Sequence, residues 1–394
     1  MKYASLNNVD VDGKRVLVRV DFNVPLDASG VVADDWRIMS ALPTINYLIN
    51  NEAVVILCSH LGRPKGTRVD HLSLRTVLPI LNKSLENISI SFSNNCFGSD
   101  VKDMVDSMQS KSVLLLENTR FWKEETDNDP YMSREMSLLA DVFVNDAFGV
   151  AHRRHATTVG IAEYIPSVAG LLMDNEMKYL EDTLLYPSRP FVCILGGAKI
   201  GDKIDVIDRL MDISDLMLIG GGMANTFLKA KGMDVGESLV ENDVLDKAYN
   251  YMKSINNNIV LPLDVIITDS FDVNGNTSVC DIEDGVKDSH MMIVDIGPKT
   301  CELYSKYILD ASLVLWNGPV GAFEIPQFAE GTNYLAKSLA QSMATTVVGG
   351  GDTAAAVRSS GYDSYINHIS TGGGAALEVL KGNILPALQV LGTL

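Results

Sequence analysis

The chain has 394 residues, which is enough for two or three domains. Hydrophobic residues make up 46% of it and charged residues 21%, as in globular proteins with a large core. The net charge of −18 argues against binding to nucleic acid, and no apolar stretch approaches the roughly 20 residues that span a membrane. Because the first residues also lack the apolar core of a signal peptide, we expect a cytoplasmic protein.

Short apolar runs alternate with helical patterns along the whole chain. The runs have the length and the near-continuous apolar character of strands in a parallel sheet that helices cover on both faces. In chain order they lie at residues 15–20, 53–58, 112–116, 141–144, 191–195, 216–219, 313–316 and 345–348. Repeated strand–helix units of this kind predict an α/β fold of doubly wound layers, each with a mostly parallel sheet flanked by helices.

A domain boundary is expected near residue 186. Pro187 and Pro190 interrupt a helical pattern at residues 175–182. Most arginines lie before this point and most glycines lie after it. We therefore predict an Arg-rich domain at 1–186, suited to bind an anion with side chains, and a Gly-rich domain from 187 on, suited to bind one with its main chain.

Five segments of the first half combine basic and polar residues, and four of them directly follow an expected strand. Their side chains include those of Asp21, Asn23, Arg37, His60, Arg63, Arg120 and Arg153. Ligands of open α/β sheets bind beyond the carboxyl ends of the strands, so these groups are expected to converge on one pocket. Guanidinium groups there would bind phosphate or carboxylate with paired hydrogen bonds. The alternative, isolated surface ion pairs, suits a single arginine better than four.

Three glycine triplets follow apolar runs in the second half, at 220–222, 349–351 and 372–374. Glycine suits places where the main chain must approach another group closely, commonly a phosphate. Tight strand-to-helix turns are the alternative, and they explain one triplet more readily than three. Lys199 and Lys203 lie at another strand–helix junction, spaced so that both can face a polyphosphate. Asp352 lies among the glycines, where a carboxylate beside phosphates indicates Mg²⁺.

Two other classes of protein fit parts of this pattern. Residues 349–354 match Gly-x-Gly-x-x-Ala, which would indicate a nicotinamide-dependent dehydrogenase, but the acidic residue expected about 20 positions later is not evident. A non-catalytic protein that binds anions or nucleotides would not need the two lysines, Asp352 and all the arginines together. The Walker A pattern and the protein-kinase signatures are absent from the sequence.

Taken together, the motifs resemble the phosphoglycerate kinase family in order and spacing, from Arg19-Val-Asp-Phe-Asn-Val-Pro25 to Ser370-Thr-Gly-Gly-Gly-Ala-Ala-Leu-Glu378. The resemblance implies a glycolytic phosphotransferase that moves the acyl phosphate of 1,3-bisphosphoglycerate reversibly to ADP, giving 3-phosphoglycerate and ATP. It implies Mg²⁺ as cofactor, in-line transfer after closure of a hinge between two domains, and a monomeric cytoplasmic enzyme. It also implies that the nucleotide-binding domain ends at 375 and that the tail, about 376–394, packs on the first domain.

The resemblance also assigns residues. The phosphoglycerate site would contain Asp21, Phe22, Asn23, Arg37, His60, Leu61, Gly62, Arg63, Arg120 and Arg153. The nucleotide site would contain Lys199, Lys203, Gly222, Asn317, Glu324, Gly350, Gly351, Asp352 and Thr353, with Asp352 as the Mg²⁺ contact. The catalytic groups would be Arg37, Lys199 and the amide groups of Gly372, Gly373 and Gly374. Trp36, Val150 and Arg154 depart from the residues common in the family, and none of them replaces a matched functional side chain.

Overall fold

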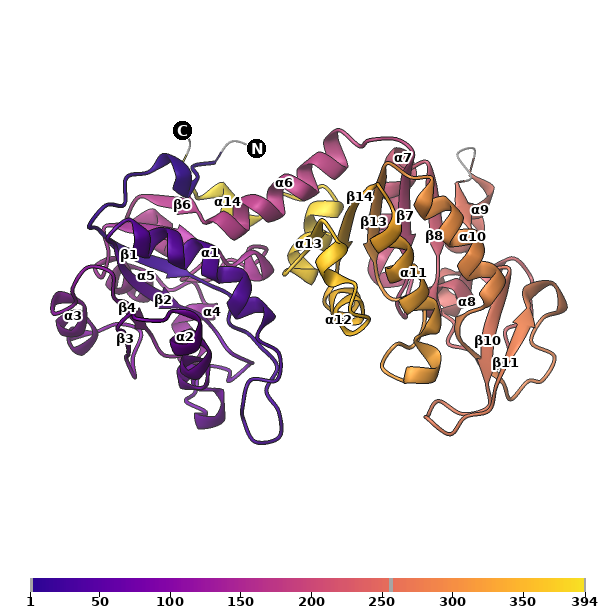
Figure 1. The fold of residues 1–394 in the computed structure, drawn as a ribbon, viewed down its shortest axis with the longest axis horizontal. Coiled ribbons are helices and arrows are strands. Elements are labelled where there is room, and N and C mark those ends of the chain that lie inside the picture. The colour runs from indigo at the N-terminus through magenta and orange to yellow at the C-terminus, as the bar shows by residue number, and fades with distance from the viewer. Residues whose placement is uncertain (1–2, 255–257, 393–394) are drawn as a thin grey trace. The chain divides into compact units, whose positions relative to one another are not determined.

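The computed structural model describes residues 3–254 and 258–392, and the chain in it divides into two compact units. Unit 1 runs to Lys178 and resumes at Ile384, and unit 2 is Tyr179–Asn383. Helix α6 (Leu171–Leu185) carries the chain from the first unit into the second (Figure 1). The boundaries expected from the sequence, at 186 and 375, fall just after this helix and within α13 (Gly373–Leu380).

The sheet of unit 1 is six-stranded and entirely parallel, in the order β3-β4-β2-β1-β5-β6. Its strands are β1 (Arg15–Arg19), β2 (Val54–Cys58), β3 (Ile90–Phe92), β4 (Val113–Leu115), β5 (Val142–Asn145) and β6 (Ser167–Ala169). The helices of this unit are α1 (Trp36–Asn50), α2 (Leu78–Ser84), α3 (Ser99–Asp106), α4 (Lys123–Thr126), α5 (Pro130–Ser137) and α14 (Pro386–Gln389).

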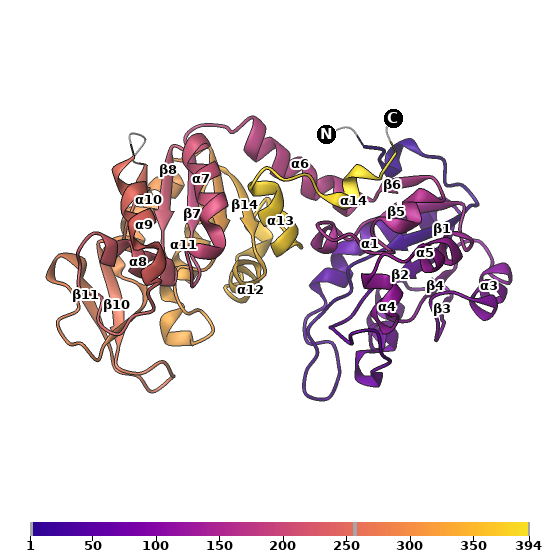
Figure 2. The same cartoon turned by 180° about the vertical axis from the view of Figure 1, so that it is seen from behind.

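Two hydrophobic cores lie on opposite faces of this sheet because successive side chains of a strand point to opposite sides. Val16 and Val18 of β1 belong to one core, which α1 and α2 cover, and Leu17 belongs to the other, which α3 and α5 cover (Figures 1 and 2). Both faces are therefore apolar, and this explains why the strands lack polar alternation in the sequence.

The main sheet of unit 2 is also six-stranded and entirely parallel, in the order β15-β14-β13-β7-β8-β9. Its strands are β7 (Phe191–Leu195), β8 (Leu216–Ile219), β9 (Ile259–Val260), β13 (Leu313–Asn317), β14 (Thr345–Gly349) and β15 (His368–Ile369). The helices, besides α13, are α7 (Ile204–Ile213), α8 (Gly221–Ala230), α9 (Leu245–Lys253), α10 (Pro298–Leu309), α11 (Glu330–Gln341) and α12 (Gly351–Ser359). The two parallel sheets confirm the predicted fold class.

Unit 2 carries a second, antiparallel sheet of three strands that the sequence did not predict. It consists of β10 (Asp264–Thr268), β11 (Thr277–Asp281) and β12 (Met292–Ile296), in the order β11-β10-β12. Val265 and Ile267 of β10 pack on Leu228 of α8 in a separate small core. This sheet is relevant to function because residues of β10 and β12 line a cavity described below.

The chain returns to unit 1 at its C-terminal end. The amide of Ala387 in α14 donates to the carbonyl of Ala151 at 3.1 Å, and Gly392 donates to Ser167 at 3.0 Å. Leu388 and Leu391 are buried. Figure 1 accordingly shows both ends of the chain on the same unit.

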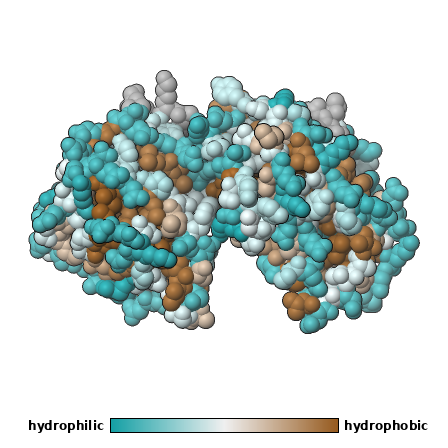
Figure 3. All heavy atoms as spheres, viewed as in Figure 1, coloured by the Kyte–Doolittle hydropathy of each residue, from teal (hydrophilic) through white to brown (hydrophobic). Residues whose placement is uncertain are grey.

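Hydrophobic side chains are interspersed with hydrophilic ones on the molecular face shown in Figure 3. Within the described residues, no helix combines the length and the apolar composition needed to cross a bilayer.

Candidate active site

Four of the side chains predicted for the site in unit 1 follow its central strands. Asp21 comes after β1, His60 after β2, Arg120 after β4 and Arg153 after β5. Because all of these strands run parallel, their carboxyl ends meet at one edge of the sheet, and the predicted convergence of these groups follows from the topology.

The buried Asp21 carboxylate organises the neighbouring predicted residues. Arg37, in the first turn of α1, donates from Nη1 to Oδ2 of Asp21 at 3.2 Å and to the carbonyl of Asn23 at 3.0 Å. The amide of Asn23 donates to Asp21 Oδ1 at 3.2 Å, and the Asn23 side-chain oxygen accepts from the amide of Gly62 at 2.8 Å. Asp21 therefore holds Arg37 and the main chain at Asn23, and Asn23 in turn holds the loop at Gly62.

Basic groups line a cavity of about 550 Å³ in unit 1. Its lining consists of Arg63, Lys65, Gly66, Arg120, Lys123, Thr126, Arg153 and His155. Arg120 donates to the carbonyl of Gly62 at 2.8 Å. The pKa of Arg120 is lowered to about 10, chiefly by burial and then by repulsion from Arg153 and Arg19. Burial also lowers the pKa of Arg153. Arg120 still carries its charge at neutral pH, and a cavity with this lining attracts anions.

His60 is buried among these arginines and is neutral. Burial is the largest cause that holds its pKa well below the usual value, and Arg19, Arg120 and Arg153 add to the effect. Arg19 Nη2 lies 3.1 Å from His60 Nδ1. Because a guanidinium can only donate, Nδ1 accepts this bond and the ring proton is on Nε2. The ring can therefore donate one hydrogen bond to a ligand.

The structure places some of the predicted residues of this site mainly in packing positions. The side chains of Phe22 and Leu61 lie in the hydrophobic core of unit 1, and their amides donate to Ser59 Oγ at 2.8 Å and Asn118 Oδ1 at 3.1 Å. Gly62 has a φ of 65°, which favours glycine, and a Cβ there would lie 2.9 Å from Leu72. Arg63 and Arg154 are exposed at the surface.

Unit 2 holds a second candidate site, where β7 leads into α7. Lys203 donates from Nζ to the carbonyls of Gly196 at 2.7 Å and Asn317 at 2.9 Å, and so ties the end of β7 to the end of β13. A Cβ at Gly196 would lie 2.1 Å from the carbonyl oxygen of Pro319. The exposed Lys199 has no hydrogen-bond or ion-pair partner among the described residues, so its ammonium group is available to a ligand.

The two later glycine triplets lie against each other at the N-termini of α12 and α13. A Cβ at Gly373 would lie only 3.1 Å from the amide nitrogen of Gly351. Gly350 has a φ of 97° and precedes α12, and no side chain caps α13 at Gly372 within the part of the chain that is described. Two adjacent helix N-termini form an anion-binding arrangement, in which the amide of the buried Gly372 donates to Ser370 Oγ at 3.3 Å.

A cavity of about 490 Å³ brings together most of the predicted nucleotide residues. It is lined by Lys199, Lys203, Asn317, Gly350, Gly351, Asp352, Thr353 and Gly373, among others. Asn317 is buried, and its Nδ2 has no hydrogen-bond partner within the described chain. Thr353 is also buried, and its hydroxyl accepts from the amide of Gly318 at 2.7 Å, so it supports the loop.

A neighbouring, more apolar cavity of about 290 Å³ shares Gly197, Ala198, Pro319 and Asp352 with the cavity of about 490 Å³. Its lining also includes Gly222, Leu239, Phe271, Asp295 and Glu324. A polar cavity joined to an apolar one has the chemistry of a site for a nucleotide, with phosphates in the first and a base in the second.

The first glycine triplet serves the packing of these loops. A Cβ at Gly221 would lie 2.7 Å from the amide nitrogen of Gly197, and one at Gly222 would lie 2.8 Å from the carbonyl oxygen of Ala198. The triplet therefore lets α8 begin directly against the loop that carries Lys199.

Sequence reasoning missed several residues at both sites. Glu241 accepts hydrogen bonds from the amides of Ile200 at 2.5 Å and Gly201 at 3.0 Å, and so holds the loop after Lys199. In unit 1 the reasoning missed Lys65 and Lys123, which line the basic cavity. Each is an ordinary charged residue in the sequence, and no local pattern distinguishes it. Arg19 lies within a motif that we identified, but its complete burial was not predicted.

The fold and the two sites define a class of protein. One unit offers an arginine-lined anion cavity, and the other offers a glycine-rich cavity with lysines, an accessible carboxylate and an adjoining apolar pocket. A two-domain α/β phosphotransferase, which exchanges a phosphoryl group between a small anion and a nucleotide, has this combination.

Comparisons with known proteins give the particular family. The family described as phosphoglycerate kinase matches residues 6–383. The chain is 50% identical over 390 residues to phosphoglycerate kinase of Dictyoglomus turgidum (98% of this chain, 97% of that one), and 48% identical over 394 residues to that of Thermosipho africanus (98% and 97%).

Solved structures agree with these relatives. The fold matches that of phosphoglycerate kinase from Coxiella burnetii with a TM-score of 0.86 and 38% identity, covering 99% of this chain and 98% of that one. It matches that from Pyrococcus horikoshii with a TM-score of 0.87 and 31% identity, covering 98% of both. The chain belongs to the phosphoglycerate kinase family, and it is a glycolytic enzyme that transfers phosphate between 1,3-bisphosphoglycerate and ADP.

Proposed function

We propose that the basic cavity of unit 1 binds the phosphoglycerate and that the paired cavities of unit 2 bind the nucleotide. The observation that supports this most strongly is the convergence of Arg120, Arg153, His60 and Asp21 at one sheet edge, with Arg37 held by Asp21. The complete set for the acid is Asp21, Phe22, Asn23, Arg37, His60, Leu61, Gly62, Arg63, Arg120 and Arg153, of which Phe22 and Leu61 act by shaping the pocket.

The nucleotide phosphates lie, in this proposal, in the cavity beside Lys199, and the base lies in the apolar cavity. Gly350, Gly351, Lys203, Thr353 and Asn317 shape the first cavity, Gly222 lines the second, and Glu324, also in the second, accepts hydrogen bonds from the ribose. This division is supported by the charge of the linings, because Lys199 and Lys203 line the polar cavity and neither lines the apolar one.

The residues present fit a Mg²⁺ ion that arrives with the nucleotide. Asp352 is exposed at the start of α12 and has no partner among the described residues. No group of three or more potential protein ligands occurs in the described chain, and Mg²⁺ typically takes one or two carboxylates and completes its shell with substrate phosphates and water. When bound, the ion would offset negative charge on the phosphates.

The reaction needs no general base. The attacking group is an anionic phosphate oxygen of ADP in one direction and a carboxylate in the other, and His60 is neutral with its proton on Nε2. The protein's task is to hold the two oxygens in line and to stabilise the charge on the phosphoryl group. We assign that task to Arg37, to Lys199 and to the amide groups of Gly372, Gly373 and Gly374.

The proposal includes closure of a hinge, because each unit contains the groups for only one substrate and in-line transfer requires the reacting oxygens to come together. One chain carries all of the assigned groups, which supports a monomer as the working enzyme. We place it in the cytoplasm, where the nucleotide and the glycolytic acids occur, and the net charge of −18 supports the absence of a nucleic-acid partner.

The substitution Lys199→Ala tests the assignment of the transferring group. We expect kcat to fall by roughly 10²- to 10³-fold, as when one preorganised charge stabiliser is removed, while KM for 3-phosphoglycerate changes little. A coupled assay of ATP consumption with 3-phosphoglycerate measures both constants. Lys231→Ala, which removes an exposed lysine after α8, is the matched control. An unchanged kcat in Lys199→Ala would refute the assignment.

A further inference from the structure

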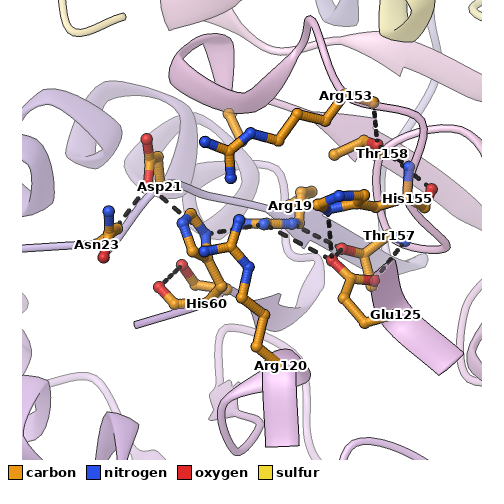
Figure 4. A network of polar contacts seen from close by, with 12 residues as sticks. Arg19, Asp21, Asn23, His60, Arg120, Glu125, Arg153, His155, Thr157 and Thr158 are labelled. Atoms are coloured by element: carbon orange, nitrogen blue, oxygen red, sulfur yellow. Dashed lines mark hydrogen bonds and ion pairs between the residues drawn. The ribbon is translucent and has the colours of Figure 1, made fainter. Parts of the chain in front are cut away.

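Glu125 is a completely buried carboxylate directly behind the basic cavity of unit 1. It belongs to the short helix α4, whose other residues Lys123 and Thr126 line the cavity, whereas Glu125 points into the protein. Figure 4 shows it beside Thr157 and Arg19, on the side from which Arg153 and His155 enter the site. A buried carboxylate persists only where its hydrogen bonds and charge are satisfied, so its partners indicate its role.

Thr157 is the principal partner. Its amide donates to Glu125 Oε2 at 2.9 Å, and its hydroxyl donates to Oε1 at 2.6 Å. The same hydroxyl accepts from Arg19 Nε at 2.8 Å. In addition, the amide of Ala156 donates to the main-chain carbonyl of Glu125 at 2.9 Å. These bonds fasten residues 156–157 to α4 and to the end of β1.

The fastened segment is the one that supplies Arg153 and His155 to the cavity. The Thr158 hydroxyl donates to the carbonyl of Arg153 at 2.8 Å and accepts from the amide of His155 at 3.0 Å. Thr158 thus holds the turn together, and Thr157 anchors it to Glu125. A shift at Thr157 would move both cavity residues at once.

Glu125 also offsets the charge of Arg19, which is fully buried. Glu125 Oε1 lies 3.9 Å from Arg19 Nη2 and 3.8 Å from His155 Nδ1. The other bonds of Arg19 go to neutral acceptors, namely Thr157 Oγ1, His60 Nδ1 and the carbonyl of Val20. The guanidinium groups of Arg120 and Arg153 point toward the same region beside His60 (Figure 4). Without Glu125, no carboxylate of the described residues would lie within 4 Å of the buried Arg19 guanidinium.

We propose that Glu125 is a positioning residue for substrate binding: through Thr157 it sets the place of Arg153 and His155, and through Arg19 it sets the orientation of His60. It touches no substrate itself. This inference rests on the proposed function of the cavity as the site of the three-carbon phosphorylated acid, and it adds a residue that acts behind that site.

The substitution Glu125→Gln tests the proposal in the full-length chain. Glutamine keeps the size of the side chain and one oxygen for the Thr157 amide, but its NH₂ group cannot accept from the hydroxyl and it carries no charge. We expect the Kd for 3-phosphoglycerate, measured by isothermal titration calorimetry, to rise about tenfold, which is the scale of a lost hydrogen bond to a charged group. The KM for ATP should stay the same. Glu124→Gln, at the adjacent exposed glutamate, is the matched control and should behave like the original chain.

A second variant keeps the test decisive if Glu125→Gln does not fold. Thr157→Val leaves the carboxylate in place and removes the hydroxyl that joins it to Arg19. We expect Thr157→Val to raise the Kd for 3-phosphoglycerate as well. The Kd of the double variant should not exceed the higher Kd of the two single variants, because both substitutions act on one bridge. An unchanged Kd in folded Thr157→Val, or a folded Glu125→Gln that melts earlier but keeps its Kd, would overturn the proposal.

Arg63→Ala separates this result from a failure of the proposed function. Arg63 lines the cavity and lies outside the Glu125 network. If Arg63→Ala weakens 3-phosphoglycerate binding and Glu125→Gln does not, the cavity is the substrate site and only the role of Glu125 is wrong. If Arg63→Ala instead weakens nucleotide binding selectively, the assignment of the cavity itself is wrong.

Discussion

Histidines in the basic cavity of unit 1 are kept neutral by their surroundings. Burial lowers the pKa of His155 to about 4, and Arg120, Arg19 and Arg153 add to this effect, whereas Glu125 opposes it. The pKa of His60 is lowered for the same principal reason. Neutral rings add no further positive charge to a site already crowded with guanidinium groups, and they can hydrogen-bond a ligand.

The shifted pKa of His155 predicts a pH dependence of stability. In the unfolded chain His155 takes up a proton near pH 6.5, whereas in the folded chain it does so only near pH 4. The contribution of His155 to the free energy of unfolding is therefore complete above pH 6.5 and is lost as the pH falls from 6.5 to 4. Both chains should lose unfolding free energy between pH 7 and pH 5, and the loss should be roughly 1 to 2 kcal/mol smaller in His155→Gln than in the original chain.

Urea unfolding of both chains at the two pH values measures this difference. Because His60 and the buried carboxyl groups titrate in both chains, the comparison isolates His155. Equal losses in the two chains would show that His155 is protonated as easily in the folded state as in the unfolded state.

Asp352 carries a prediction about the metal. Asp352→Asn keeps the size of the side chain and removes its charge, so we expect the Mg²⁺ concentration for half-maximal activity to rise about tenfold or more, with little change in melting temperature because the group is exposed. Activity as a function of Mg²⁺ at fixed ATP gives the value. The same substitution at the exposed Asp310, after α10, serves as control. A Mg²⁺ requirement identical in both variants would remove Asp352 from the metal site.

Several residue assignments were possible from the sequence, and others were not. The arginines were recognisable because four of the five segments that carry basic and polar residues follow apolar strands. Glu125 and Thr157 form bonds across 32 residues of sequence, and nothing local marks either of them. The motif residues Thr353 and Lys203 hold main-chain groups of neighbouring loops, a task that only the folded arrangement reveals.

At the scale of elements, the apolar strands of the two parallel sheets were predictable except for β3, β6, β9 and β15, and the antiparallel sheet of β10, β11 and β12 was not. All eight expected strands are present, with ends that differ by at most one residue. β9 and β15 have two residues each and β3 has three, so no periodicity could identify them. β11 is largely exposed on both faces, which removes the hydrophobic pattern that marks a strand.

The glycine loop at the start of α12 gives a prediction about close approach. Gly351 has nothing within 4 Å of the position of an added Cβ, and it has no positive φ, so Gly351→Ala should leave the melting temperature unchanged. If a phosphate of the nucleotide lies close to this main chain, the added methyl group occupies the position of that phosphate. The Kd for ADP should then rise about tenfold, which corresponds to a loss of roughly 1.4 kcal/mol in binding free energy.

Gly350→Ala provides the contrast, because its φ of 97° is strained for alanine and the fold should lose stability as well. Differential scanning calorimetry and ADP titration separate the two effects. An unchanged ADP affinity in Gly351→Ala would mean that the phosphates do not approach this loop.

At the scale of the whole molecule, the two kinds of anion site are divided between two units with separate cores. Unit 1 supplies most of the arginines and unit 2 supplies the glycine loops. Neither unit contains both sets of groups, so in the proposed mechanism the hinge lies in the chain that links the units, which includes α6.

This division predicts a change of dimensions on binding. With 3-phosphoglycerate and a non-reactive ATP analogue together, small-angle X-ray scattering should give a smaller radius of gyration than with either ligand alone, because closure excludes water and brings the substrates together. Arg63→Ala at the same ligand concentrations should show a smaller change. An unchanged radius in the doubly liganded chain would contradict hinge closure.

The sequence by itself determined the α/β class, the parallel strands and the residue types of both sites, because these depend on local periodicity and on motifs at strand ends. Tertiary structure alone decided which charged groups are buried together, which glycines are needed for packing rather than for a ligand, and that Glu125 lies behind the basic cavity. Burial, shared hydrogen bonds and close approach of loops arise between residues far apart in the chain, and no local pattern encodes them.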